Sequence, residues 1–282
     1  MKPHHPAGIA AVATGTTLGA LQRLPLLDPV DRRILLCHAL GLTRAGLITQ
    51  SERALTEAEA AALSQLFQRR LDGEPVAYIV GQREFFGLPF QVSEAVLIPR
   101  PDTELLVELA LERLPPKGRL LDMGTGSGAI AVAVAHTRPD AAVTALDVSA
   151  AALAVARRNA GANGVRVTCL ESDWYGALDG QRFELIVSNP PYIASGDRHL
   201  TEGDLRFEPA GALTDHADGL AALRHIVQGA ARHLAPQGTL LMEHGYDQAA
   251  AVRALLVEAG FTQVQSWLDL AGIERVSGAR LP

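Results

Sequence analysis

The hydrophobic pattern of the C-terminal two-thirds of the chain alternates between short apolar runs and longer amphipathic segments. The runs are typical of buried strands, and the segments repeat apolar residues at helical spacing. Strands are expected at residues 120–122, 143–146, 165–170, 183–187 and 239–242 and near 264 and 273, with helices at 104–111, through 135, at 149–157, 220–234 and 248–259. This alternation predicts an α/β fold with a doubly wound, mostly parallel, seven-stranded sheet.

The N-terminal part of the chain has helical periodicity without strand-like runs. Asp28 followed by Pro29 is a favourable start for a helix, and the apolar positions that follow stop at Gly41. A second helix is expected to begin at Thr56, because Glu59 stands three residues later, as in a capping box. We therefore predict a small helical domain at the N-terminal end.

Two short strand-like runs, at 83–86 and 89–92, are separated by Gly87 and Leu88, which predicts a β-hairpin. Because this hairpin stands between the helical and the alternating patterns, we expect it to link two domains. The predicted organisation has four parts, which are a flexible tail at 1–20, a helical domain at 21–75, a hairpin linker at 76–98 and an α/β domain at 99–282.

Composition and charge argue against several classes of protein. The net charge is −6, with nine basic and eight acidic residues in 1–90 and 16 and 23 in the remainder, so stable nucleic-acid binding is disfavoured. Cys37 and Cys169 are the only cysteines and lack metal-ligand spacing, which favours a reduced, cytoplasmic setting without a metal site. No apolar run approaches the roughly 18 residues of a membrane span.

A glycine-rich loop, Asp122-Met123-Gly124-Thr125-Gly126-Ser127-Gly128, joins the first strand of the alternating pattern to its helix. The glycines permit positive φ and let a ligand approach the backbone closely. A dinucleotide site has the spacing G-x-G-x-x-G, whereas here the third glycine arrives one residue early, which disfavours a nicotinamide dehydrogenase. Asp147 ends the second strand, 19 residues after Gly128, and offers a carboxylate to a ribose diol. Together these features favour an adenosine-type cofactor.

Ser172-Asp173-Trp174 follows the third predicted strand. Asp173 can accept from an adenine amino group, and a ring contact by Trp174 is worth ~0.5–1.5 kcal/mol beyond burial. Taken singly, Asp147 is explained equally well as a helix cap, Trp174 as a core residue and the glycines as a tight turn. All of these positions stand at carboxyl ends of strands, where open α/β sheets bind ligands, and jointly they favour a cofactor site.

The motif Asn189-Pro190-Pro191-Tyr192 follows the fourth predicted strand, beside the same edge of the sheet. Two prolines fix their own φ and remove two backbone donors, and the residue before a proline is held extended. The Asn189 side-chain oxygen and the Pro190 carbonyl form a cluster of acceptors, with the Tyr192 ring beside them. Such a site suits a planar NH2 group. For this motif alone, a rigid proline turn with an incidental asparagine is the alternative.

The segment 97–104 leads into a helix with two prolines at its entry and acidic residues in its first turn. This is explained simply as a well-capped helix. Alternatively, the helix N-terminus and Arg100 hold a carboxylate. Arg100 and Thr103 are therefore candidate substrate-binding residues.

With D-x-G-x-G-x-G at 122–128, an acid after the second strand and N-P-P-Y at 189–192, the chain resembles class I S-adenosylmethionine-dependent methyltransferases acting on a planar nitrogen. Within that class it is most similar to the N5-glutamine methyltransferases of peptide chain release factors, the PrmC/HemK family. Further matching segments are G-E-P-V-A-Y-I-V-G at 73–81, L-I-P-R-P-D-T-E at 97–104 and L-R-F-E-P at 205–209. These segments separate it from amino-methylating DNA enzymes, which share N-P-P-Y. Met123 is unusual within the glycine loop.

The resemblance implies a Rossmann-like fold, S-adenosyl-L-methionine as cofactor, and the glutamine of the Gly-Gly-Gln loop of class 1 release factors as substrate. Asn189 and the Pro190 carbonyl would accept from the glutamine NH2, with Tyr192 against the amide, and these three are the implied catalytic residues. Pro191, Arg100 and Thr103 complete the implied substrate site. The implied cofactor contacts are Gly124, Thr125, Gly126, Ser127, Gly128, Asp147, Asp173, Trp174 and Asn189. As hypotheses separate from the resemblance, we expect the helical domain to dock the release factor and the enzyme to be a monomer.

Several alternatives remain open at this stage. An amino-methyltransferase for adenine in nucleic acid, or for a ribosomal-protein glutamine, has the same acceptor motif, although the acidic balance argues against nucleic acid. A non-catalytic cofactor-sensing or partner-binding module would not need an acceptor motif beside a cofactor loop. The helices of 21–75 equally serve to cover the sheet, and Arg69-Arg70 is equally explained as solvated charge. No His or Lys lies in the acceptor motif, so we name no general base.

Overall fold

The computed structural model describes residues 12–282, which form two compact units, one ending at Gly81 and the other running from Gln82 to Pro282. Each unit has a hydrophobic core of its own. Residues 1–11, the larger part of the expected tail, lie outside the described residues. Within 12–282, no helix combines the length and apolar character that crossing a membrane requires.

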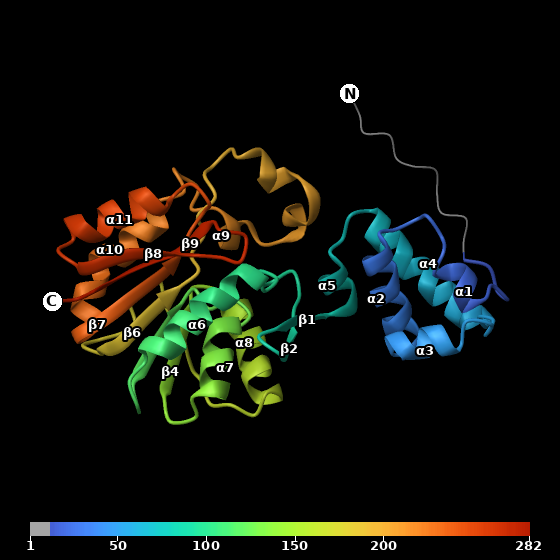
Figure 1. Cartoon of the computed structure of the whole chain (residues 1–282), viewed down its shortest axis with the longest axis horizontal. Coiled ribbons are helices and arrows are strands. Elements are labelled where there is room, and N and C mark those ends of the chain that lie inside the picture. Colours follow the sequence, from blue (N-terminus) through green and yellow to red (C-terminus); the bar gives the residue numbers. More distant parts are fainter. Residues whose placement is uncertain (1–11) are drawn as a thin grey trace. The chain divides into compact units, whose positions relative to one another are not determined.

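The first unit consists of helices packed around an apolar core (Figure 1). Its helices are α1 (Leu18–Leu21), α2 (Pro29–Leu40), α3 (Arg44–Thr49), α4 (Glu57–Leu71) and α5 (Val76–Val80). α2 begins as predicted, because Asp28 Oδ1 accepts from Val30 N at 2.8 Å, and it ends at Gly41 with a left-handed φ of 62°. α4 has the predicted capping box between Thr56 and Glu59. The helical N-terminal domain is therefore confirmed.

The borders of this unit differ from the predicted domain borders. Within the expected tail, Val12 N donates to Ser64 Oγ at 3.0 Å and Leu18 is fully buried, so residues 12–20 belong to the helical core. Within the expected linker, residues 76–80 form α5, whose Ile79 packs into the same core. A five-residue apolar run is too short for its periodicity to distinguish a helix from a strand.

The second unit contains a seven-stranded sheet in the order β5-β4-β3-β6-β7-β9-β8. The strands are β3 (Arg119–Met123), β4 (Ala142–Asp147), β5 (Thr168–Glu171), β6 (Phe183–Ser188), β7 (Leu234–Glu243), β8 (Thr262–Leu268) and β9 (Glu274–Arg280). Strands β3 to β7 are parallel, whereas β9 runs antiparallel to both β7 and β8. The predicted doubly wound, mostly parallel sheet is confirmed.

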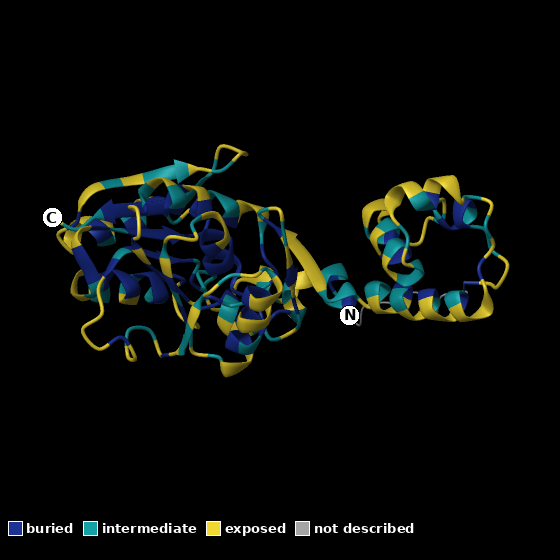
Figure 2. Ribbon diagram, turned by 90° about the horizontal axis from the view of Figure 1, so that it is seen from below, coloured by how far each residue is buried: buried dark blue, intermediate teal, exposed yellow. Residues whose placement is uncertain are grey.

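Helices cover both faces of this sheet (Figure 1). One face carries α6 (Glu104–Arg113), α7 (Ala129–Thr137) and α8 (Ala150–Ala162), and the other carries α10 (Ala221–His233) and α11 (Ala249–Glu258). Because successive side chains of a strand point to opposite faces, Leu120 belongs to the first core and Leu121 to the second. Figure 2 shows the sheet as the buried layer of this unit. A short helix η1 (Pro101–Thr103) precedes α6, and η2 (Arg198–Thr201), η3 (Gly203–Phe207) and α9 (Ala210–Leu213) lie between β6 and β7.

The predicted hairpin is present as β1 (Gln82–Phe85) and β2 (Leu88–Gln91), and it belongs to the second unit instead of forming a free linker. Phe85 and Phe90 are buried and meet edge-on, with ring centroids 5.9 Å apart, in the core beneath α6 and α7. Asn159 of α8 accepts from Gln91 N at 2.7 Å and donates to Gln91 O at 3.0 Å. These contacts fix the hairpin on the sheet domain.

The strand order brings the carboxyl ends of β3, β4 and β6 together at one edge of the sheet. From β3 the chain proceeds to β4 and β5 on one side and then crosses to β6 on the other side. Ligand-binding crevices of open α/β sheets form at such a reversal. The glycine loop, Asp147 and Asn189 are the residues that leave these three strands.

Candidate active site

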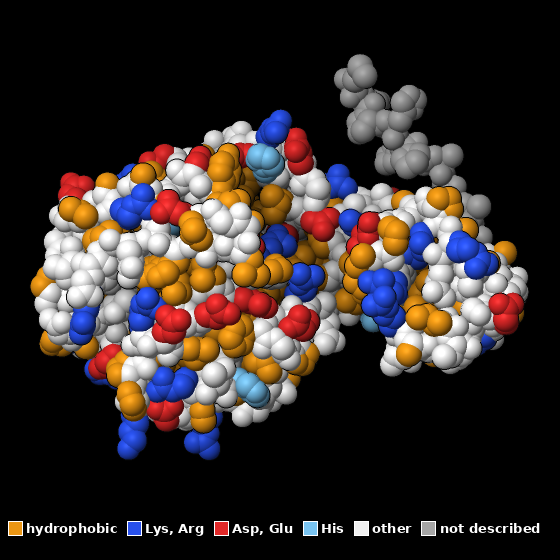
Figure 3. Space-filling model, in the orientation of Figure 1, with side chains coloured by type: hydrophobic (Ala, Val, Ile, Leu, Met, Phe, Trp, Pro, Cys, Tyr) orange, Lys and Arg blue, Asp and Glu red, His pale blue; other side chains and the backbone are white. Residues whose placement is uncertain are grey.

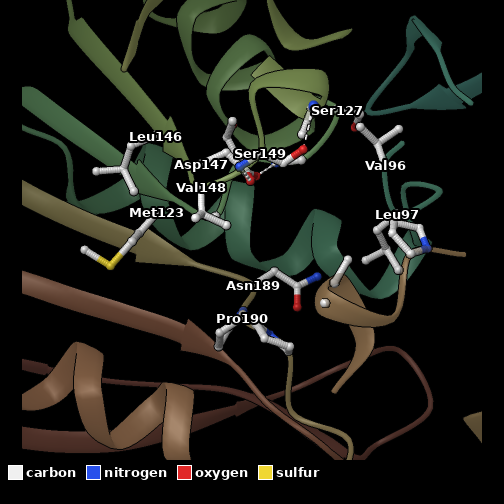
Figure 4. Close-up of a pocket in the computed structure, with 18 of the residues that line it drawn as sticks. Val96, Leu97, Met123, Ser127, Leu146, Asp147, Val148, Ser149, Asn189 and Pro190 are labelled. Atoms are coloured by element: carbon white, nitrogen blue, oxygen red, sulfur yellow. Dashed lines mark hydrogen bonds between the residues drawn. The ribbon is translucent and has the colours of Figure 1, made fainter. Parts of the chain in front are cut away.

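A cavity of about 290 Å³ lies at the carboxyl ends of β3, β4, β5 and β6 (Figure 4). Its wall contains most of the residues that the sequence assigned to the site, namely Arg100, Thr103, Gly124, Thr125, Gly126, Ser127, Asp147, Asp173, Trp174, Asn189, Pro190 and Pro191. Gly128 and Tyr192 are not part of the wall. Apolar side chains such as Val96, Leu97 and Met123 complete it. The arrangement suits a ligand with a flat apolar part and a few polar groups.

The glycine loop adopts a backbone that side chains rarely tolerate. Gly124, Gly126 and Gly128 have φ of 72°, 53° and 82°, in the left-handed region. A Cβ added to Gly124 or Gly126 would meet no heavy atom within 4 Å, whereas one on Gly128 would lie 3.1 Å from Ala156 Cβ. The first two glycines therefore keep space open, and Gly128 allows α7 to pack against α8.

Asp147 is held by backbone donors on either side of the cavity. Its Oδ2 accepts from Gly126 N at 2.8 Å, and its Oδ1 accepts from Ser149 N at 2.9 Å (Figure 4). The side chain is half-buried, and each oxygen keeps a lone pair for a further donor. The carboxylate thus has a fixed orientation before any ligand binds, and the cap of α8 is the neighbouring Ser149, whose side chain accepts from Ala152 N.

Asp122 is a second carboxylate at this edge, entirely buried beneath the loop. Its Oδ2 accepts from Thr125 Oγ1 at 2.6 Å and from Ala131 N at 3.2 Å, while Oδ1 has no partner among the described residues. Burial raises the pKa of Asp122 to about 7, although its two hydrogen bonds lower it and the charge of Asp147 raises it. An unsatisfied buried oxygen beneath the loop indicates that a further polar group belongs there.

Asp173 and Trp174 follow β5 and form the far wall of the cavity. The turn that presents them is fixed by Ser172, whose Oγ donates to Trp174 O at 2.7 Å and accepts from Ala177 N at 3.0 Å. Asp173 is exposed, and the half-buried Trp174 ring lies 5.3 Å from the ring of His225. Both side chains border the space where the sequence placed an adenine.

Asn189 lies directly after β6, which is tied to β3 by the hydrogen bond from Ser188 Oγ to Met123 O at 2.7 Å. The Asn189 Nδ2 donates to Thr103 Oγ1 at 3.1 Å. Its Oδ1 has no donor among the described residues, and Pro190 stands next to it in the wall. The side-chain nitrogen is therefore engaged by the protein, and the oxygen is available to a ligand.

Arg100 reaches the cavity wall but is already paired with a carboxylate of this chain. Its guanidinium forms an ion pair with Glu208, whose side chain is fully buried and whose Oε2 accepts from Ile98 N at 3.0 Å. Arg100 was expected to hold a substrate carboxylate, whereas here Glu208 occupies its guanidinium. The pair joins the start of α6 to the loop before α9, so it shapes the wall.

Tyr192 differs in placement from the sequence-based expectation. Its ring packs against the core beneath α10 and α11, and its hydroxyl donates to Glu243 Oε1 at 3.3 Å, so the ring does not face the cavity. Burial, followed by the charge of Glu243, raises the pKa of Tyr192. Glu243 is a site residue that the sequence motifs did not predict. Its signal is an acidic residue that directly continues the apolar run of β7.

Comparison with known proteins assigns both units. Residues 27–81 match the PrmC N-terminal domain, and residues 101–207 match the Methyltransferase small domain. The release factor glutamine methyltransferase of Burkholderia pseudomallei is 58% identical over 275 residues, which cover 94% of this chain and 96% of that protein. The Bordetella pertussis protein of the same description is 56% identical over 269 residues, which cover 94% of this chain and all of that protein.

A solved structure supports the same conclusion for the fold. The Thermus thermophilus 16S rRNA N2 G1207 methyltransferase (RsmC), in complex with AdoMet and guanosine, superposes with a TM-score of 0.54 at 25% identity. The match covers 71% of this chain and 50% of that chain. From the family matches and the close relatives we conclude that the chain belongs to the release factor glutamine methyltransferases, a family of S-adenosylmethionine-dependent enzymes.

Proposed function

We propose that this chain transfers the methyl group of S-adenosylmethionine to the side-chain nitrogen (N5) of the glutamine in the Gly-Gly-Gln loop of class 1 peptide chain release factors. The observation that carries the proposal is the side-chain oxygen of Asn189, left without a donor beside the Pro190 carbonyl in the wall of the cavity. Two neighbouring acceptors match the two N–H donors of a carboxamide. The same wall contains the glycine loop and Asp147.

The residues of the glycine-loop side fit S-adenosylmethionine. The open space at Gly124 and Gly126, which a Cβ would fill, admits a ligand against the backbone. We expect Asp147 to accept from the ribose hydroxyls, Asp173 from the adenine amino group, and Trp174 to pack on the adenine ring. When bound, the cofactor supplies a methyl group attached to a positively charged sulfur.

The chain's contribution to the reaction is positioning. A carboxamide nitrogen is a weak nucleophile, so its orientation toward the methyl carbon has to provide much of the acceleration, and correct placement contributes roughly 7–11 kcal/mol. Asn189 Oδ1 and the Pro190 carbonyl accept from the NH2 group and stabilise the positive charge that develops on nitrogen. Thr103 holds the Asn189 amide in the required orientation. Tyr192 supports the motif from below, and Pro191 borders the same wall.

The direct test mixes the purified chain, a release factor and isotopically labelled S-adenosylmethionine, and maps the peptides by mass spectrometry. We expect one methyl group on the glutamine that follows two glycines. A release factor with that glutamine replaced by alanine is the control and should remain unlabelled. Label on DNA, or on a ribosomal-protein glutamine with an unlabelled release factor, would contradict the proposal. On the face that Figure 3 shows, acidic and basic side chains lie among apolar ones.

We further propose that the helical unit docks the release factor, and that the enzyme acts as a cytoplasmic monomer. Val30 and Ile34 of α2 are spaced by four residues and are 49% and 37% exposed, which makes a short apolar stripe on this helix, and Leu26, in the turn before the helix, is 39% exposed. Replacing Val30 and Ile34 with serine should raise the KM for release factor without changing kcat or cofactor affinity. An unchanged KM would remove the stripe from the docking surface.

A further inference from the structure

Glu243, which the proposed reaction does not use, is buried directly beneath the acceptor motif. It is the last residue of β7, and the register that pairs Ser188 with Met242 places it beside Asn189 at the ends of two neighbouring strands. Its relative exposure is 1%, and Oε2 has no hydrogen-bond partner among the described residues. A buried carboxylate in that condition costs stability, so its presence calls for a function.

Two hydroxyl groups act on this carboxylate. Tyr192 Oη donates to Oε1 at 3.3 Å, and the Thr103 side chain lies near enough to the carboxylate to lower the pKa of Glu243. The Thr103 oxygen at the same time accepts from Asn189 Nδ2 at 3.1 Å. Because a lone pair of the Thr103 oxygen faces the Asn189 nitrogen, the single proton of this hydroxyl is left to point toward another acceptor, and the Glu243 carboxylate is near.

The charges that act on Glu243 come from two elements, η1 and β9. Asp102 of η1 raises its pKa and Arg275 of β9 lowers it, although Arg275 is itself shared between Asp269 at 3.1 Å and Asp102 at 3.6 Å. The adjacent His244 is engaged by Ser277 Oγ and Gly245 O. Burial is the largest influence and raises the pKa of Glu243 to about 7.

We infer that Glu243 is a positioning residue for methyl transfer, whose carboxylate orients the Thr103 hydroxyl and thereby holds the Asn189 amide with its oxygen available to the substrate. Tyr192 anchors the other end of the motif to the same carboxylate. Protonation of Glu243 would reverse the arrangement, because the new O–H of Glu243 would donate to the Thr103 oxygen. It would then compete with the Asn189 NH2 group for the lone pairs of that oxygen. This inference rests on the proposed function for the identity of the substrate.

The pH dependence of kcat has a definite direction, because only the charged form of Glu243 positions Thr103. Because Glu243 loses its proton near pH 7, kcat should rise as the pH increases through about 7. Stability should respond in the opposite sense, since a carboxyl group with a raised folded-state pKa loses stabilisation as pH rises from its unfolded value near 4.5 through about 7. Activity and stability therefore move in opposite directions over one pH interval.

The first experiment measures Glu243→Gln, with Glu184→Gln as the matched control, since Glu184 pairs with Arg119 at the opposite end of β6. For E243Q we expect kcat at about pH 8 to fall about tenfold, KM for release factor and cofactor affinity to stay within about twofold, and the thermal midpoint to rise. The inflection of kcat near pH 7 that belongs to Glu243 should disappear, whereas any contribution from Asp122 would remain in both variants. Unchanged kcat and an unchanged pH profile would overturn the inference.

A second pair of variants acts on the intermediate hydroxyl. Thr103→Val should lower kcat to a similar extent, Thr103→Ser should restore it, and the double variant T103V/E243Q should lose little more than either single variant, because both act along one path. Independent, additive losses would contradict the inference.

A readout without substrate separates this inference from the proposed function. The side-chain NH2 resonance of Asn189 should shift with an inflection near pH 7 in the wild-type chain and not in E243Q. Wild-type protein that shows this inflection but does not methylate a release factor would refute the proposed function alone. Wild-type protein that methylates the release factor with no such inflection would refute the role of Glu243 alone. Wild-type protein that shows neither the inflection nor methylation would refute both proposals.

Discussion

The cofactor half and the substrate half of the cavity are held in place by different kinds of contact. The cofactor half is formed by the glycine loop, Asp147 and the Asp173-Trp174 turn. Here the Asp147 carboxylate accepts from backbone N–H groups, one of them 21 residues away. In the substrate half, side chains pair across long stretches of sequence. Asn189 and Thr103 are 86 residues apart, and Arg100 and Glu208 are 108 residues apart.

The difference teaches how each half tolerates change. Backbone donors stay in place when a neighbouring side chain is altered, so the cofactor half should lose only the contact that is removed. A side chain held by another side chain loses its orientation when its partner is replaced, so the substrate half should lose geometry as well. Single substitutions should therefore affect kcat or the KM for release factor in the substrate half, and cofactor affinity in the cofactor half.

The largest effect is expected for Asn189→Ala. The variant removes one of the two acceptors for the glutamine NH2 group, and loss of one group that stabilises developing charge typically costs about 10²–10³ in kcat. Steady-state kinetics with release factor should show this loss. Calorimetry with S-adenosylhomocysteine should show cofactor affinity close to that of the wild type, although the motif also borders the cofactor. Undiminished turnover would remove Asn189 from the reaction.

Asp147→Ala should mainly weaken cofactor binding. Hydrogen bonds to a charged group contribute about 1.5–3 kcal/mol, so removing the carboxylate should reduce cofactor affinity roughly 10- to 100-fold. Calorimetric titration measures the affinity, and kcat at saturating cofactor should change far less. Asp140→Ala is the matched control, because Asp140 pairs with Arg138 on the surface and does not border the cavity. Equal affinities of the two variants would contradict the assignment of Asp147.

The same contrast explains which parts of the site were accessible from sequence. The glycine loop, Asp147 and Asn189 each follow a strand directly, so alternation of apolar runs located them at one edge of the sheet before any tertiary contact was known. The parallel strands of the sheet were predictable for the same reason, since most of them are apolar runs. β8 and β9 contain many polar and charged residues, and the sequence placed them only near 264 and 273.

Contacts between distant side chains were not accessible in this way. Nothing local to Arg100 indicates that Glu208 neutralises it, and nothing local to Tyr192 indicates that its hydroxyl meets Glu243 and that its ring packs away from the cavity. The domain borders differed for a related reason. The short apolar run 76–80 is a helix because its side chains pack into the core of the helical unit. The hairpin belongs to the sheet domain because its side chains pack into the core of that domain.

A smaller effect, on stability and wall geometry together, is expected for Glu208→Gln. The Glu208 side chain is fully buried and that of Arg100 is 33% exposed, so loss of the pair should cost about 1–3 kcal/mol, less than for a pair with both members buried. Thermal unfolding measures the loss. KM for release factor should rise while cofactor affinity stays constant, because Glu208 holds Arg100 in the substrate half of the cavity wall. A drop in cofactor affinity equal to that of D147A would break the distinction between the halves.

The smallest effects should separate two glycines of one loop. Gly126→Ala places a methyl group in open space at a φ of 53°, so it should cost about 1–2 kcal/mol of stability and a few-fold of cofactor affinity. Gly128→Ala also places alanine at a left-handed φ, here 82°, and brings Cβ to 3.1 Å from Ala156, which adds about 1–3 kcal/mol of overpacking. Because Gly128 does not border the cavity, its variant should be the less stable of the two and bind cofactor nearly normally while folded. Melting curves measure the stability of the two variants, and calorimetric titration measures their cofactor affinity. If Gly128→Ala bound cofactor more weakly than Gly126→Ala, the open space at Gly126 would not be what determines cofactor binding.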